Sequence, residues 1–357
     1  MYSGKLHFSG DYVLRDLWTH LIRFVVDAGW TIHRVLPKEE GVSSYDISHD
    51  IVVEELDTWI DLPSADAYEE SFTPTLQEGV DYEINRPLGR VRFLSGGSVT
   101  AGQTVHIDYQ WKREGVILFS PGYSGEEQIY VGLRPFIDTD GVHGRIELKA
   151  YLGFQEEMEF EDTTLGEPLN KYSLELWSGE TDLWIFVSPQ RIIGVDHIQG
   201  YYGCFYLGLL NRLCLPHEYP YPLCIISSDC KDYDYASTSD HRRFFPDAHN
   251  VCFVTPDNRW NAYLSHEWNS PFHFLPLQAD TGYLEQIHYP ESAKRALLPV
   301  YLWWHEEEIL GELEGVYLAP GAISSSESEI TAGDDTYICF ENVFRHEWKD
   351  FMAILEA

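Results

Sequence analysis

The chain has 357 residues, with 58 acidic against 24 basic side chains and a formal net charge of −34. This negative charge repels phosphate backbones and no basic run interrupts it, so nucleic-acid binding is excluded from the expected functions. No apolar run reaches the roughly 18 residues of a membrane-spanning helix, and the first residues lack a signal-peptide pattern. We therefore expect a protein made in the cytoplasm, without membrane insertion and with its six cysteines reduced.

Residues 11–30 are predicted to form the one clear helix. A wide apolar stripe recurs at three- and four-residue steps. It consists of Leu14, Leu17, Trp18, Leu21, Ile22, Phe24 and Val25. The other, polar face carries Arg15, Asp16, Thr19 and Arg23. Asp11 can cap the start of the helix and Gly29 can supply a left-handed stop.

Residues 50–112 alternate between apolar and polar with a period of two, which is typical of strands. The apolar positions of this alternation are Tyr82, Ile84, Val91, Phe93, Val105, Ile107, Tyr109 and Trp111. Glycine-containing turns at 86–89, 95–97 and 101–103 separate these strands. We predict a small, self-contained β-sandwich that is inserted after the helix.

From residue 115 onward the strand signals continue, and several segments, such as LWIFVS at 183–188, are apolar throughout. Such runs are expected of strands buried on both faces. The predicted fold is therefore mainly β, with a short N-terminal helix and a multi-domain β-sandwich architecture. The expected divisions are 1–49, which joins the main body, 50–112, the inserted module, and 113–357, the main β-rich domain.

The stretch CLPHEYPYPLC, residues 214–224, raises the question of a metal, disulfide, catalytic or purely structural loop. Pro216, Pro220 and Pro222 each fix φ and remove a hydrogen-bond donor, so this stretch cannot join a central strand. We predict a stiff contact loop. Its two tyrosines, Tyr219 and Tyr221, are expected to pack on the protein's own core or on a neighbouring subunit.

The metal alternatives are weaker. Zinc sites use closely paired ligands, whereas Cys204, Cys214, Cys224 and Cys230 are ten, ten and six residues apart. A site from Cys214, Cys224 and His217, His241 or His249 would depend on tertiary proximity alone. Calcium at Asp229, Asp232 and Asp234, or along 156–162, lacks the twelve-residue loop pattern. We predict no metal and no cofactor.

No catalytic motif is found. The HExxH pattern fails at His266 and at His346, and no nucleophile elbow, phosphate loop or dinucleotide fingerprint occurs. A carboxylate pair acting on a glycosidic bond stays open as an alternative, because sequence does not identify such a pair. Aromatic side chains such as Trp268, Trp303 and Trp304 could stack on sugars. We expect a protein that is not an enzyme.

Residues 191–228, RIIGVDHIQGYYGCFYLGLLNRLCLPHEYPYPLCIISS, resemble a pattern in virion structural proteins of tailed bacteriophages. These proteins also have an apolar strand pair and a Y-x-G-F/Y-Y/F-L-G segment before a YPYPL loop. The segment from 311 to the C-terminus resembles the end of the same proteins. Residues 78–110, EGVDYEINRPLGRVRFLSGGSVTAGQTVHIDYQ, are similar to small immunoglobulin-like modules of phage tail proteins.

The resemblance implies a place in a virion, in the tail or baseplate with the neck as a further option, and it implies no reaction. The expected partners are other virion proteins and further copies of this chain in a symmetric homo-oligomer. Two alternatives stay open: a tail module that binds host-surface glycan, and an enzyme that degrades polysaccharide.

Overall fold

The computed structural model describes residues 2–9, 13–36, 45–112, 115–137, 143–156, 159–160, 172–177, 179–198, 200–227, 229–230, 251–261, 272–275, 297–304, 309–319, 325–341 and 351–356. Over these residues the protein is mainly β, with one helix and several antiparallel sheets, which confirms the predicted fold class. No helix within the described ranges is long and apolar enough to cross a membrane.

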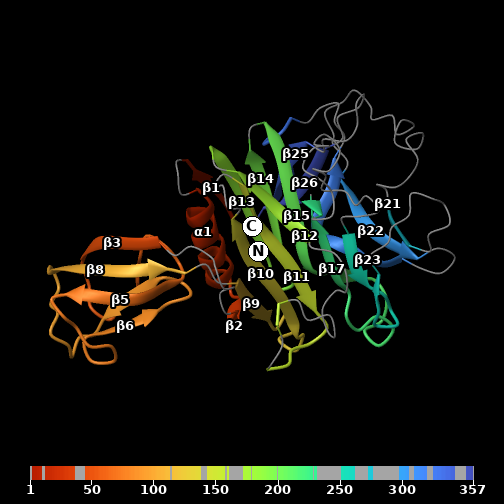
Figure 1. Cartoon of the computed structure of the whole chain (residues 1–357). Helices are drawn as coiled ribbons and strands as arrows, with labels where there is room; N and C mark the ends of the chain where they lie inside the picture. Colours follow the sequence, from red (N-terminus) through yellow and green to blue (C-terminus); the bar gives the residue numbers. More distant parts are fainter. Residues whose placement is uncertain are drawn as a thin grey trace.

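The centre of the molecule is a seven-stranded sheet, the central sheet, with a further sheet packed on each face (Figure 1). Its strand order is β1 (Tyr2–Phe8), β13 (Thr181–Val187), β14 (Arg191–Ile198), β15 (Tyr201–Leu209), β17 (Leu223–Ser227), β19 (Val251–Val254) and β20 (Trp260–Asn261). Strand β1 pairs along its whole length with β13, so the first strand belongs to the main body.

One face is covered by the front sheet, with the order β18 (Asp229–Cys230), β12 (Tyr172–Trp177), β11 (His143–Tyr151), β10 (Ile129–Ile137), β9 (Gly115–Ser120) and β2 (Thr31–Leu36). The other face is covered by the C-terminal sheet. Its order is β21 (Phe272–Leu275), β22 (Leu298–Trp304), β23 (Ile309–Ala319), β26 (Phe351–Leu355), β25 (Asp335–Glu341) and β24 (Glu329–Ala332), and β16 (Asn211–Arg212) also pairs with β23.

Alternate residues of the central strands enter two different cores. In β13, Leu183 and Ile185 pack in the core shared with the front sheet, whereas Trp184 and Phe186 pack in the core shared with the C-terminal sheet. Because both faces need apolar side chains, polar alternation is lost along the strand. The prediction that this apolar run is buried on both faces is confirmed.

Helix α1 (Val13–Asp27) packs its apolar stripe into the front core, through residues such as Leu17, Leu21 and Val25. Gly29 ends the helix with φ near 108°, as predicted, and its amide donates to the carbonyl of Val26. The predicted cap, Asp11, lies outside the described residues.

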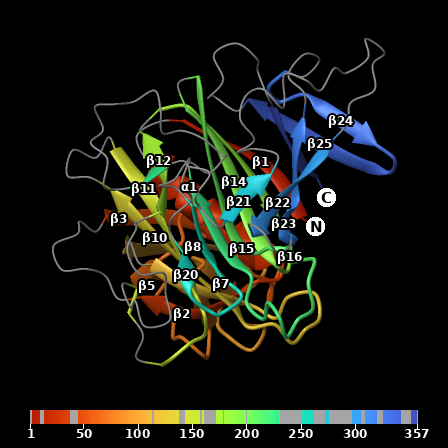
Figure 2. The ribbon, with the colours of Figure 1, turned by 90° about the vertical axis from the view of Figure 1, so that its right-hand side faces the viewer.

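The inserted module consists of two three-stranded sheets with a core of their own. One sheet has the order β3 (Tyr45–Val52), β8 (Thr104–Trp111) and β5 (Ala67–Thr73), and the other β4 (Ile60–Asp61), β7 (Arg90–Phe93) and β6 (Tyr82–Asn85). The module lies beside α1, far from β25 of the C-terminal sheet, in two perpendicular views (Figures 1 and 2).

The boundary at residue 50 falls inside a strand. Strand β3 begins at Tyr45 and pairs with β8 from Tyr45 opposite Trp111 to Val52 opposite Thr104. Its first residues, YDISHD, are mostly polar and carry little strand signal. Pairing with β8, about sixty residues later in the chain, supplies what the local sequence lacks.

The polar face of the helix is partly covered by the module, and Thr19 and Arg23 on this face are buried. The Thr19 hydroxyl accepts a hydrogen bond from the amide of Ala65 at 2.9 Å. The Trp18 indole donates to Asp66 Oδ2 at 2.7 Å. Helical periodicity marks a polar face, but it does not show which polar groups another part of the chain will satisfy.

Candidate functional site

The contact loop, residues 214–224, follows β16 of the C-terminal sheet and ends in the first two residues of β17 in the central sheet; all three of its prolines lie outside strands. Tyr219 is fully buried in the core beneath the C-terminal sheet and donates its hydroxyl to the carbonyl of Val254. Burial raises the pKa of the Tyr219 hydroxyl well above its usual value. Tyr219 therefore serves as an anchor and not as a proton-transfer group at neutral pH.

The rest of the loop is held by hydrogen bonds to its backbone. Arg212 Nη1 donates to the carbonyls of Tyr219 and Pro220 at 3.1 and 3.0 Å. The carboxylate of Glu218 accepts from the amide of Leu215 at 2.9 Å, and the Leu215 carbonyl accepts from the amide of Glu218 at 2.9 Å. Pro216 is exposed and Pro222 is buried. The three prolines therefore stiffen a loop that is also fixed at both ends.

This fixed loop presents apolar side chains to solvent. Tyr221, unlike Tyr219, is 37% exposed, and Leu213 and Leu215 are 52% and 56% exposed. The amide of Leu213 donates to the carbonyl of Leu310, next to the exposed Ile309. We call Leu213, Leu215, Tyr221 and Ile309 the loop surface. Large apolar residues held rigidly in water are a feature of protein contact sites.

The cysteines around the loop are thiols with structural positions. Cys224 is buried on β17, and burial raises the pKa of its thiol well above the usual value. The Cys214 thiol donates to the carbonyl of Leu310 at 3.6 Å, while His217 is exposed. The five cysteines whose side chains the structure describes, Cys204, Cys214, Cys224, Cys252 and Cys339, are thiols.

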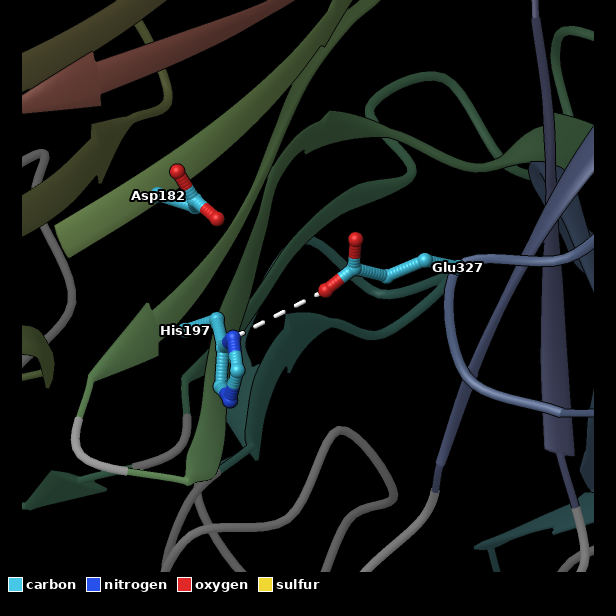
Figure 3. A group of neighbouring side chains, drawn as sticks. All are labelled: Asp182, His197 and Glu327. Atoms are coloured by element: carbon cyan, nitrogen blue, oxygen red, sulfur yellow. Dashed lines mark ion pairs between the residues drawn. The ribbon is translucent and has the colours of Figure 1, made fainter.

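A different group brings possible metal ligands together. Asp182 on β13, His197 on β14 and Glu327, just before β24, place ligand atoms within 4.8 Å of one another (Figure 3). Among the residues that the structure describes, these three form the one group whose ligand atoms are close enough to hold a metal ion. The group contains none of Cys214, His217 and Cys224. Asp182 and His197 are cross-strand neighbours in the central sheet.

A lysine ammonium already lies between the two carboxylates. Lys5 Nζ is 3.2 Å from Asp182 Oδ2 and 3.3 Å from Glu327 Oε2, and it lies over the Trp184 ring at 4.3 Å. The Tyr202 hydroxyl donates to Glu327 Oε1 at 3.0 Å, and the His197 ring stacks on Tyr202. The group is therefore a salt-bridge network in which Lys5 supplies the positive charge. It ties β1 to the C-terminal sheet, and we call it the clasp.

The pKa shifts of Asp182 and Lys5 define the pH range over which the clasp stabilises the fold. Burial alone would raise the pKa of Asp182, but hydrogen bonds from His7 and Lys5 outweigh it and lower that pKa. Burial alone would lower the pKa of Lys5, but its bonds to Asp182 and Glu327 raise it. A lowered carboxyl pKa stabilises the fold above about pH 4, and a raised ammonium pKa stabilises it below about pH 10. Both contributions are present at neutral pH.

We expect Lys5→Met to lower the free energy of unfolding by less than about 1 kcal/mol in dilute salt, because solvent screens these partly exposed charges. The loss should shrink in 1 M NaCl, which screens the pairs further. Urea unfolding at both salt concentrations measures the difference. Arg259→Met, which removes the exposed pair with Asp257, is the control. A salt-independent loss would show that Lys5 acts by packing alone.

Several sequence predictions lie outside the described residues. They include Trp268, Asp232, Asp234, His241, His249, His266, His346 and much of the acidic segment 156–162. Cys230 and Trp304 lie on described strands, but their side chains are not described. The sequence patterns did not single out Trp59 and Tyr68, two aromatic side chains that line a groove on the module. The only sequence signal was a tryptophan in a short polar connection, DTWID.

No known protein family matches the chain. A search of curated proteins finds no relative either.

Proposed function

We propose that the chain is a structural component of a tailed bacteriophage particle, placed in the tail or baseplate, and that it mediates the assembly of subunits. The resemblance of residues 191–228 supports this role. Those residues form β14 and β15, the middle of a sheet buried on both faces, followed by the contact loop. The segment that resembles virion proteins is therefore both the centre of the fold and the base of the loop surface.

The observation that carries the proposal is the rigid, apolar loop surface on a highly acidic protein. Two copies of the chain, each with a net charge of −34, repel each other in most relative orientations. An apolar contact avoids that repulsion, since Leu213, Leu215, Tyr221 and Ile309 carry no charge. Because the loop is ordered before binding, association costs less conformational entropy. A neighbouring copy of this chain is therefore the proposed occupant of the loop surface.

We expect the purified protein to form a closed oligomer, which Leu213→Ser with Leu215→Ser converts towards monomer. Analytical ultracentrifugation at several concentrations measures the distribution. Val52→Ser with Val80→Ser is the matched control, because it removes two similarly exposed apolar side chains from the module. If the loop variant forms an oligomer as stable as that of the wild type, the loop surface is not part of the subunit interface.

The place in a particle is tested separately. Tailed particles purified from the lysate of cells that make the protein should contain it, and antibody labelling should mark the tail or its end. Particles that lack the protein would contradict the proposed function, whatever the oligomeric state of the purified chain.

A further inference from the structure

An open groove lies on the surface of the inserted module, remote from the contact loop. It has a volume of about 520 Å³ and is largely open to solvent, and its lining includes Trp59, Tyr68, Glu78, Glu83, Asn85 and Arg86. This volume lies within the range of small-ligand sites, which combine apolar rings with a few converging polar groups. Two strands that are edges of different sheets, β5 and β6, contribute to it. The groove thus spans the open side of the sandwich.

The tryptophan of the groove is held in place before any ligand arrives. Trp59 is 41% exposed, and the Arg92 guanidinium lies over its ring at 4.8 Å. Arg92 is itself fixed by Glu83, whose Oε2 accepts from Arg92 Nη2 at 2.6 Å and from Nε at 2.9 Å. Both bonds use one oxygen of Glu83. The other oxygen takes no hydrogen bond from Arg92.

Two further lining residues, Glu78 and Arg86, are equally well fixed. Arg86 Nη2 donates to Glu70 Oε1 at 2.6 Å and to Glu78 Oε2 at 2.7 Å, and these bonds raise the pKa of Arg86. The Tyr82 hydroxyl also donates to Glu70, and burial with this carboxylate raises the pKa of Tyr82 to about 12. Glu78 and Arg86 therefore line the groove in fixed positions, with Arg86 also held by Glu70 behind them.

Tyr68 is placed by an irregularity in its strand. The register between β5 and β8 shifts between Tyr68 and Ser71, and Glu69 within this bulge has φ near 52°. A left-handed conformation is uncommon for a residue other than glycine, and bulges re-aim the side chains beside them. Here the bulge sets Tyr68 at the groove, with Lys112 Nζ 5.6 Å from its ring centroid.

We propose that this groove binds an oligosaccharide that is neutral or contains amino sugars. Sugar rings have apolar C–H faces that match the rings of Trp59 and Tyr68, and hydroxyls that match carboxylate, amide and guanidinium groups. In the groove Arg86 balances Glu78 and Arg92 balances Glu83, so the net charge of −34 is what excludes acidic glycans and phosphate-bearing ligands. The proposal does not rest on the structural role, because the groove and the loop surface share no residue.

The test uses the intact chain and four probes: maltotriose, chitotriose, the fully deacetylated chitosan trisaccharide and an acidic hyaluronan tetrasaccharide. Saturation-transfer NMR and tryptophan fluorescence report binding. We expect saturable binding of at least one of the first three and none of the fourth. Trp59→Ala should weaken binding about tenfold, equivalent to about 1.4 kcal/mol, while Trp59→Tyr keeps most of it. Tyr68→Ala should also weaken binding.

The control is Tyr123→Ala, which removes an exposed aromatic side chain from the main body and should leave binding unchanged. Circular dichroism and thermal unfolding of each variant exclude a general loss of fold. The proposal is overturned if no probe binds saturably, if only the acidic probe binds, or if binding survives both Trp59→Ala and Tyr68→Ala.

Discussion

Replacing Glu147 by alanine is expected to lower the free energy of unfolding by about 3–5 kcal/mol, because it leaves two arginines in place without their buried counter-charge. Glu147 on β11 is 2% exposed. Its Oε2 accepts from Arg134 Nη2 at 2.6 Å and its Oε1 from Arg145 Nη2 at 3.0 Å. Urea unfolding at pH 7 measures the loss.

A matched control exists in the module. Glu83 and Arg92 form the same kind of cross-strand pair as Glu147 and Arg134, but both side chains are partly exposed. Glu83→Ala should therefore cost less than about 1 kcal/mol. If the two substitutions cost the same, burial is not what makes the Glu147 network important. Adding Arg134→Met and Arg145→Met to Glu147→Leu should restore much of the stability, since an apolar cluster can replace a buried ion network.

The pH dependence of this network has a definite sign. Burial alone would raise the pKa of Glu147, but the charges and hydrogen bonds of Arg134 and Arg145 outweigh it and lower the pKa. A lowered carboxyl pKa stabilises the fold above its unfolded value of about 4.3, and this contribution is lost as pH falls through the folded pKa. The difference in the free energy of unfolding between wild type and Glu147→Gln should therefore narrow only under acidic conditions.

Features that depend on local sequence patterns could be predicted well from the sequence. Contacts between residues far apart in the chain could not. The apolar run of β13 reads as a strand buried on both faces because each face has its own core. The contact loop could be recognised because three prolines act locally. By contrast, Lys5 pairs with Glu327, 322 residues later, and no periodicity connects them.

The same limit explains the two sites that sequence reasoning missed. Tyr68 lies on the edge strand β5 of one sheet and Trp59 directly before β4 of the other, and both line the groove only because the sandwich brings the two sheets together. Glu147 reads as one polar residue in an alternating strand, GRIELKAY, whose polar face would normally meet water. That face is instead covered: Phe160 lies against Arg134 and Phe136 against Arg145.

Arg23 links the helix to the module through three hydrogen bonds to backbone carbonyls. Its Nε donates to the carbonyl of Leu88 at 2.7 Å, and its Nη2 donates to those of Leu62 and Gly89, both at 2.8 Å. Leu88 also packs into the front core, although it belongs to the module. Within the module, the turn that carries two of these acceptors is itself tightly packed: Gly89 has φ near 56°, and an added Cβ would lie 1.8 Å from the Ser64 carbonyl oxygen. The module and main body therefore share a fitted interface.

This interface changes what removal of the module is expected to do. The sequence predicts that 50–112 can be deleted and the chain closed with a short linker. That deletion would leave Tyr45–His49 without β8, take Leu88 from the front core, and leave Arg23 without its three acceptors. We expect the deletion of 50–112 to yield little soluble protein. Single substitutions at the interface are the better test.

Arg23→Met is expected to lower the free energy of unfolding by about 3 kcal/mol, because three buried carbonyls lose a charged donor. Burial lowers the pKa of Arg23, but arginine stays protonated at neutral pH, so the loss should not depend on pH there. Hydrogen–deuterium exchange should quicken in α1 and at 62–66 while β7 and β8 stay protected, since the module keeps its own core. Arg90→Met, which removes the more exposed pairs with Asp27 and Asp61, should cost less than about 1 kcal/mol. Exchange that quickens equally through β7 and β8 would mean that the module has no stability of its own, and that docking on α1 is what keeps it folded.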